Sequence, residues 1–131
     1  MAQDYRYDEN AGSAANRHFH DAKKLEEDHR YDNAGYHYGF AAECAVKHAL
    51  IQTGILKGDP IIRKLHFPEL RGNAVLALQG RTSRGLLNLL QPSFMQHWDV
   101  AMRYSSSGMI DREKAEKWRI DANKAIGLML F

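Results

Sequence analysis

The sequence predicts an all-α protein, an up-and-down bundle of four or five helices with short helical pieces between helices 2 and 4. Three observations support this prediction. Apolar residues recur at the i, i+3, i+4 spacing of amphipathic helices in several long stretches. No stretch alternates polar and apolar residues as hairpin strands do. The 131 residues, 44% of them hydrophobic, suffice for one core, so we expect a single domain over residues 13–131 after a flexible tail of residues 1–12.

The first helix is expected over residues 13–28. Ser13 is its expected N-cap, because a short side-chain oxygen there accepts a free amide of the first turn. Four apolar residues follow at helical spacing: Ala15, Phe19, Ala22 and Leu25. The short connection HRYDN then predicts that the first two helices are antiparallel neighbours.

The stretch from Tyr31 to Gly54 predicts a central helix of about five turns. Asp32 or Asn33 is the expected N-cap, and Gly54 the expected end, because glycine adopts the left-handed conformation without a Cβ penalty. One broad face is apolar: Ala34, Tyr38, Ala41, Ala42, Ala45, Ala49 and Leu50. The opposite flank carries three more apolar residues: Phe40, Cys44 and Ile51. A helix that is apolar nearly all round is usually buried, so this one should lie at the centre of the bundle.

The next stretch, ILKGDPIIRKLHFPELRGN, contains two prolines and predicts a loop. Pro68 suits the first position of a short helix over residues 69–78, because its missing amide costs nothing there. Gly80 should end this helix. Thr82 or Ser83 should cap a second short piece, RGLLNLL.

Two further helices are expected in the last third of the chain. In SFMQHWDVAMRY, one stripe holds Phe94, Trp98 and either Ala101 or Met102. After a turn at SSSG, Asp111 should cap the last helix. Its apolar residues recur at helical spacing: Ala115, Trp118, Ala122, Ala125, Ile126 and Met129.

The charge is small overall but uneven. A formal net charge of +2 is too low to indicate a nucleic-acid partner by itself. Residues 54–85 carry six basic and two acidic side chains, a local excess of +4. Such a region attracts phosphate, although mildly basic loops are also common without any ligand. His66 and Arg71 belong to it, and each either contacts phosphate or caps a helix.

Several classes of protein are excluded. No apolar run approaches the roughly 20 residues that a membrane span needs, and the N-terminus lacks the apolar core of a signal peptide. With Cys44 as its one cysteine, the chain is expected to be soluble and cytoplasmic. His37, Cys44 and His48 share a helical stripe, but zinc requires a fourth ligand and closer spacing. We therefore predict no metal site and no cofactor.

Two groups of residues are candidates for ligand binding. Glu43 and Lys47 have the spacing and order of a favourable i,i+4 ion pair on a buried helix. They either hold helices in register or form a polar pocket in which Glu43 orients Arg103 or a ligand. Arg103 and Tyr104 end the helix that contains Trp98. Arg103 either stabilises that helix end through the helix dipole or binds a phosphate.

The order of these motifs resembles the HEPN family, the domain named for nucleotide binding in higher eukaryotes and prokaryotes. The resemblance rests on NAGYHYGFAAECAVKHAL, with its core of Ala41, Glu43, Ala45 and Lys47, then on LHFPEL, WDVAMRYS and an alanine-rich last helix. It implies an up-and-down bundle, a homodimer and a nucleotide or RNA ligand. It also implies a minimal nucleotidyltransferase as partner in a toxin–antitoxin or defence-type system. Glu43, Lys47, Arg103 and Tyr104 would then be the ligand-binding residues.

The nuclease activity of many family members is not implied. Those members carry an arginine followed after four to six residues by a histidine on a late helix. Here Arg103 is followed by YSSSGMI, without a histidine. A formal match occurs at Arg30 and His37, which leaves a metal-independent endoribonuclease with a rearranged site as one alternative. A purely structural dimerisation module is the other.

Overall fold

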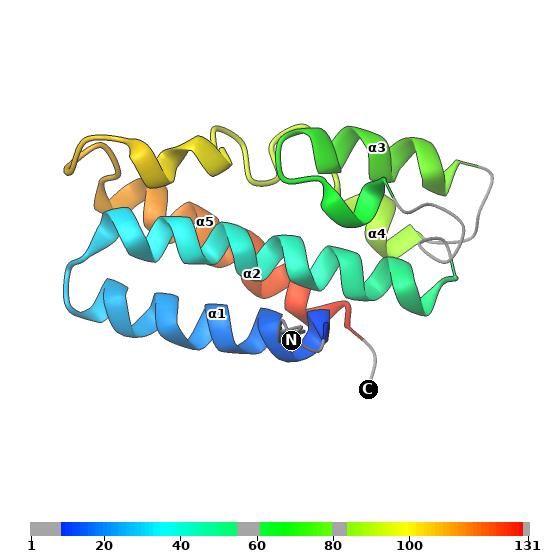
Figure 1. Ribbon diagram of the computed structural model, residues 1–131, viewed down its shortest axis with the longest axis horizontal. Coiled ribbons are helices and arrows are strands. Elements are labelled where there is room, and N and C mark those ends of the chain that lie inside the picture. The colour runs from blue at the N-terminus through cyan, green and yellow to red at the C-terminus, as the bar shows by residue number, and fades with distance from the viewer. Residues whose placement is uncertain (1–8, 55–60, 80–83, 130–131) are drawn as a thin grey trace, which may run out of the picture.

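The computed structural model describes residues 9–54, 61–79 and 84–129. Every regular element within these residues is helical, which confirms the predicted all-α class. Three long helices form the body: α1 (Ala11–Glu27), α2 (Tyr31–Gln52) and α5 (Arg112–Gly127). Figure 1 shows α1 and α2 side by side and antiparallel, with α5 behind them, and both α1 and α5 pack chiefly on α2. The helix predicted to be central is therefore the centre of the bundle.

Four shorter elements complete the described part of the fold: η2 (Ile62–Lys64), α3 (Glu69–Leu78), α4 (Arg84–Leu89) and η3 (Val100–Tyr104). Of these, η2 and η3 are 3₁₀ helices. Helix α3 and η3 lie along α2 on the side opposite α1 (Figure 1). None of the described helices combines the length and the apolar character needed to cross a membrane.

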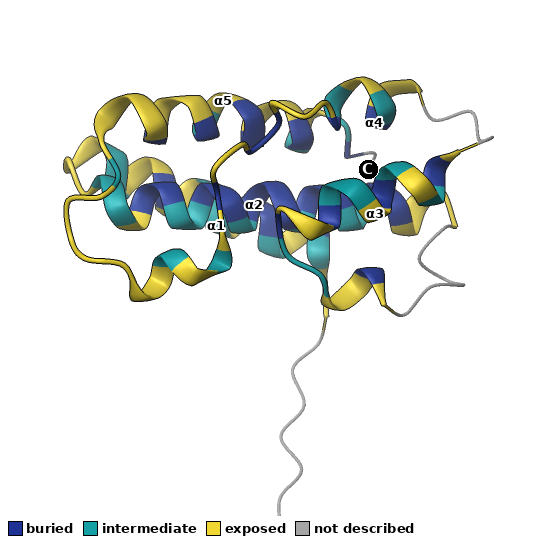
Figure 2. Ribbon diagram, turned by 90° about the horizontal axis from the view of Figure 1, so that it is seen from above, coloured by how far each residue is buried: buried dark blue, intermediate teal, exposed yellow. Residues whose placement is uncertain are grey.

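The core is built around α2, whose alanines and glycines let large side chains approach its backbone. Figure 2 shows α5 buried on the side that faces α2 and exposed on the other. Trp98 and Trp118 are both buried and lie against Gly39 and Gly35 respectively. The indole Nε1 of Trp98 donates to the carbonyl oxygen of Gly35 at 3.1 Å, and that of Trp118 to the carbonyl oxygen of Gln96 at 3.0 Å. Both tryptophans thus bury their rings without leaving an indole N–H unsatisfied.

Two of the predicted helix caps were wrong. Helix α1 begins at Ala11, and its N-cap is Asn10, whose side chain accepts from the Ser13 N–H at 2.9 Å. Ser13 is therefore already inside the helix, as are the last two residues of the predicted tail. Residues 1–8 of that tail lie outside the described residues. Helix α2 begins at Tyr31 with Arg30 as N-cap and no side-chain cap, so Asp32 and Asn33 already lie inside the helix.

The caps and bounds of the later helices agree better with the prediction. Asp111 is the N-cap of α5 and accepts from the Lys114 N–H at 2.9 Å. Helix α3 spans the predicted residues, with Pro68 as its N-cap rather than as its first helical residue. Gly80, Thr82 and Ser83, predicted to end α3 and cap α4, lie outside the described residues.

The helix predicted around Trp98 is not formed. Residues 92–97 make a series of turns in which Met95 and His97 have φ values of 51° and 72°. The side chain of Asp121, only 5% exposed, accepts from the Met95 N–H at 2.9 Å. A buried carboxylate that needs a donor thus replaces the helical hydrogen bond of Met95. Phe94 and Trp98 of the predicted stripe are buried, whereas Ala101 is exposed.

Candidate functional site

A surface hollow of about 520 Å³ lies where the α1–α2 turn meets the segment around η3. One wall comes from residues 29–33 and the other from residues between 102 and 110. Arg30 and Arg103, both singled out in the sequence, lie on opposite walls. We call this space the Arg30–Arg103 hollow. Its other polar residues are His29, Tyr31, Asp32, Asn33, Ser105, Ser106 and Ser107.

Asp32 holds the two walls together. Its Oδ2 accepts from the Gly108 N–H at 2.9 Å, and its Oδ1 accepts from the Ile110 N–H at 3.1 Å. Gly108 has a φ of 90°, a left-handed conformation that glycine adopts without strain. Both carboxylate oxygens of Asp32 are thus bound by backbone amides. The segment before α5 is thereby fixed against the first turn of α2.

Arg103 is carried into the hollow by η3. Asp99 begins this 3₁₀ helix, because its side chain accepts from the Ala101 N–H at 2.8 Å. The Arg103 guanidinium lies over the ring of Tyr104, 5.2 Å from its centroid. Tyr104 itself is 81% exposed, so it forms part of the outer surface next to the hollow.

The hollow presents positive charge. Within the described residues, neither Arg30 nor Arg103 forms an ion pair with a carboxylate, and Asp32 is already bound by two amides. Arginine presents planar, paired N–H donors that match two oxygens of a phosphate or carboxylate. Ser106 and Ser107 add exposed hydroxyl donors to the same wall. The arrangement is suited to bind an anion with several oxygens.

Glu43 and Lys47 lie elsewhere and bind each other. Glu43 is 4% exposed, and the Lys47 Nζ lies 3.0 Å from its Oε1. The His66 Nδ1 lies 2.8 Å and 3.0 Å from the two carboxylate oxygens of Glu43. Lys47 also donates to the carbonyl oxygen of Arg63 at 2.8 Å. This network ties α2 to η2 and to the loop before α3, and it does not bring Glu43 into contact with Arg103.

Tyr36 lies on α2, between Asp32 and Glu43 along the chain. Its ring stacks on Trp98, with centroids 5.8 Å apart and planes inclined by 12°. Burial raises the pKa of the Tyr36 hydroxyl, while the positive charge of Arg103 lowers it and the charge of Glu43 adds to the rise. Tyr36 is therefore within electrostatic range of both Arg103 and Glu43.

His37 does not line the Arg30–Arg103 hollow. It lies two helical turns beyond Arg30, about 10 Å along the axis of α2. Its Nδ1 faces the Nδ1 of His18 on α1 at 3.2 Å, and the two rings stack with centroids 5.4 Å apart. Burial lowers the pKa of both histidines, and the charge of His37 lowers that of His18 further. The structure therefore pairs His37 with His18 rather than with Arg30.

The other singled-out residues have separate surroundings. Burial raises the pKa of the Cys44 thiol to about 11, which leaves little thiolate at neutral pH. The ring of His48 lies against Gly12 of α1. Arg71 donates to the carbonyl oxygen of Leu90 at 3.1 Å, so it links α3 to the end of α4.

Several residues of the site were missed by sequence reasoning. Asp32 was considered only as a helix cap, and the serines at 105–107 only as a turn. His29 and Tyr31, whose hydroxyl lies 3.2 Å from the His29 Nδ1, were considered only as part of a connection. The signal that could have found them was the polar run SSSG, which follows Arg103 and Tyr104.

The fold and the hollow together define a class of protein, a small helical bundle with a cationic site at one end. The sequence profile of the HEPN domain matches residues 12–129, nearly the whole chain. The chain therefore belongs to the HEPN domain family. Membership supports a function associated with nucleotides or RNA. Neither a curated protein nor a solved structure matches the chain significantly.

Proposed function

We propose that this protein binds a phosphate-bearing ligand, a nucleotide or RNA, in the Arg30–Arg103 hollow. The observation that carries the proposal is that two arginines, distant in sequence and without a carboxylate partner among the described residues, meet on opposite walls of one hollow. Phosphate oxygens accept from arginine N–H groups in pairs, and the exposed hydroxyls of Ser106 and Ser107 supply further donors. The nucleotide or RNA association of the family supports the same ligand class.

In this proposal Arg103 and Tyr104 contact the ligand, whereas Glu43 and Lys47 support the helix behind the site without touching the ligand. The exposed ring of Tyr104 offers a face on which a base can stack. The Glu43–Lys47–His66 network fixes the backbone of α2 and so the position of Tyr36, which lies within electrostatic range of Arg103.

We further propose that the protein acts as a homodimer in the cytoplasm. In a toxin–antitoxin or defence-type system, its partner would be a minimal nucleotidyltransferase. Met109 is 59% exposed and adjoins Gly108 and Ile110, which line the hollow. A protein surface that covers this part of the rim would bury a large apolar side chain and leave Tyr104 for the base. Mass measurement in solution tests the dimer. Co-purification with a nucleotidyltransferase encoded beside the gene tests the partner.

Nucleotide binding is tested by titrating ATP and a short RNA into the protein and its variants. Arg103→Gln and Arg30→Gln should each weaken binding about tenfold, because each removes a charged hydrogen-bond donor. Arg84→Gln, an exposed arginine on α4 outside the hollow, is the matched control and should bind normally. Equal affinities for all four proteins would contradict the proposal.

A structural dimerisation module is the second candidate. The observation in its favour is that Glu43, Lys47 and His66 satisfy one another, so this part of α2 needs no ligand. A stable dimer that binds neither ATP nor RNA would establish this candidate. An endoribonuclease built on Arg30 and His37 would lose RNA cleavage in His37→Ala, and cleavage that survives this change would exclude it.

A further inference from the structure

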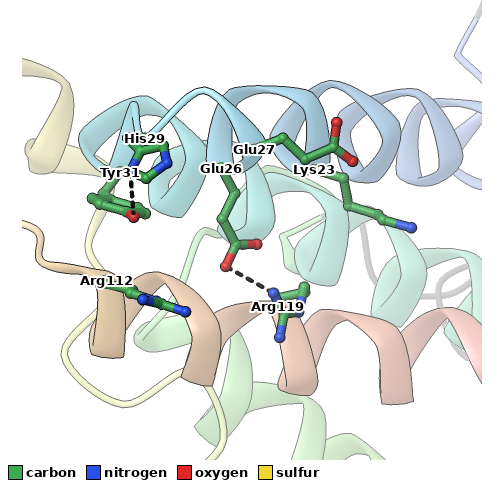
Figure 3. Close-up of a pocket in the computed structure, with 7 residues that line it drawn as sticks. All are labelled: Lys23, Glu26, Glu27, His29, Tyr31, Arg112 and Arg119. Carbon is green, nitrogen blue, oxygen red and sulfur yellow. Dashed lines mark hydrogen bonds and ion pairs between the residues drawn. The ribbon is translucent and has the colours of Figure 1, made fainter.

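A second hollow, of about 290 Å³, lies between α1 and α5 on the other side of the α1–α2 turn. Figure 3 shows its cationic residues: Arg112 and Arg119 project from α5 and Lys23 from α1. Arg112 is the first residue of α5, directly after the cap Asp111. We call this space the Arg112 hollow.

The carboxylates of the Arg112 hollow are already engaged. Glu26 accepts from the Tyr38 hydroxyl at 2.6 Å and pairs with the Arg119 Nη1 at 2.8 Å, as Figure 3 shows for the arginine. Glu27, which also lines the hollow, lies 3.8 Å from Lys24 in an exposed ion pair. Within the described residues Arg112 has no carboxylate partner, so its positive charge is left for a ligand.

The two hollows meet at the α1–α2 turn. His29 and Tyr31 line both of them. In Figure 3 the Tyr31 hydroxyl points from the turn toward α5, on the side where Arg112 lies. Arg30 and Arg103 thus lie on one side of a single pair of side chains, and Arg112 lies on the other. Arginines on both sides of His29 and Tyr31 can bind a chain of phosphates, whereas a single phosphate would contact only one side.

We propose that the two hollows form one track for the backbone of a single-stranded polynucleotide. Arg30 and Arg103 bind one phosphate and Arg112 binds a neighbouring one, while the backbone passes over His29 and Tyr31. This inference rests on the proposed function and narrows its ligand from a mononucleotide to a chain of nucleotides. It adds a site residue, Arg112, that lies outside the first hollow.

The test is a length series of oligouridylates, from the mononucleotide to the octanucleotide, titrated into the protein at several salt concentrations. The expected result is that affinity rises with length and that Arg112→Gln removes this rise. Octanucleotide binding should weaken about tenfold, while mononucleotide binding should stay unchanged. The slope of log K against log salt should also fall by about 0.7, the value for one lost phosphate contact on a single strand.

Two further variants separate the inference from the proposed function. Arg103→Gln should weaken binding at every length, and Arg84→Gln at none. If Arg112→Gln binds the octanucleotide normally while Arg103→Gln does not, the track is overturned and the first hollow stands. If Arg103→Gln binds both lengths normally, the proposed function fails as well. Arg119 is left unchanged because its substitution would break the pair with Glu26.

Discussion

The indole ring of Trp98 lies directly against Gly39 of α2, and a Cβ at position 39 would overlap that ring. Trp98 comes from an irregular segment, and its Nε1 reaches past Gly39 to the carbonyl oxygen of Gly35. A glycine one turn along the helix therefore decides whether this tryptophan can dock. The same tryptophan supports Tyr36 by stacking.

Replacing Gly39 by alanine should destabilise the protein despite alanine's higher helix propensity. We expect a loss of about 3 kcal/mol, because the ring must move away from α2 and give up its packing and hydrogen bond. Urea unfolding followed by tryptophan fluorescence measures it. Gly72→Ala in α3 is the control, since nothing lies within 4 Å of its added Cβ, and it should gain up to about 1 kcal/mol. Equal effects of the two changes would contradict this account.

Replacing Asp32 by alanine should loosen the wall of the Arg30–Arg103 hollow. The N–H groups of Gly108 and Ile110 lose their acceptor, at a cost of about 1–3 kcal/mol. Hydrogen exchange at these two amides should accelerate more than at amides of α2. Asp28→Ala removes an exposed carboxylate from the same turn and serves as the control. Unchanged exchange at Gly108 in Asp32→Ala would refute the role given to Asp32.

The His18–His37 pair should make stability depend on pH. Burial lowers the pKa of both below the ordinary value near 6.5, with the charges of His37 and Arg17 also lowering that of His18 and Asp21 opposing the shift in both. Below that value the unfolded chain binds more protons than the folded one. The stabilisation is therefore complete above about pH 6.5 and is lost as the pH falls toward the folded pKa values.

Urea unfolding at about pH 7.5 and about pH 5 measures this dependence. His37→Gln should flatten it by removing one member of the pair. His20→Gln, at an exposed position of α1, the helix that carries His18, is the control and should keep the wild-type dependence. A steeper loss of stability at low pH in His37→Gln would contradict the assignment.

Replacing Asp121 by alanine should release the segment of residues 92–98. The Met95 N–H would be left without its acceptor in a buried place, and Lys117, which also pairs with Asp121, would lose its partner. We expect the free energy of unfolding to fall by about 3 kcal/mol, chiefly because the Met95 N–H loses its acceptor. Lys117 adds little to this loss, because it is half exposed and regains water. Thermal unfolding measures it. Asp121→Asn keeps one acceptor oxygen and should cost less than the alanine change. The reverse order would refute the hydrogen-bond account.

The sequence was informative wherever local rules decide the structure. The small residues of α2, the proline before α3 and the aspartate before α5 each act within a few residues, and the corresponding helices lie where they were predicted. The prediction of a helix around Trp98 was wrong because the backbone of this segment is held by Asp121, which lies on α5. Phe94 and Trp98 have the spacing of one helix face, but a series of turns buries both rings equally well.

The site was less predictable than the fold, for a related reason. Glu43 and Lys47 were paired correctly from their spacing, but their third partner, His66, comes from a loop. One of the two alternatives left open for Glu43 was that it orients Arg103, but Arg103 lies across a hollow from Arg30 instead. Contacts between residues so far apart in the chain depend on how η3 packs against α2, and no local residue pattern encodes that packing.

The bond from Asp32 to the amides of Gly108 and Ile110 has a consequence for biosynthesis. One wall of the Arg30–Arg103 hollow emerges from the ribosome early, whereas the amides that complete the hollow emerge only near the end of translation. A nascent or truncated chain that lacks these amides has no complete hollow, so the proposed ligand cannot bind prematurely. Conversely, a ligand that spans both walls would clamp the first and last thirds of the polypeptide together, and its presence should protect the termini of the bundle from proteolysis.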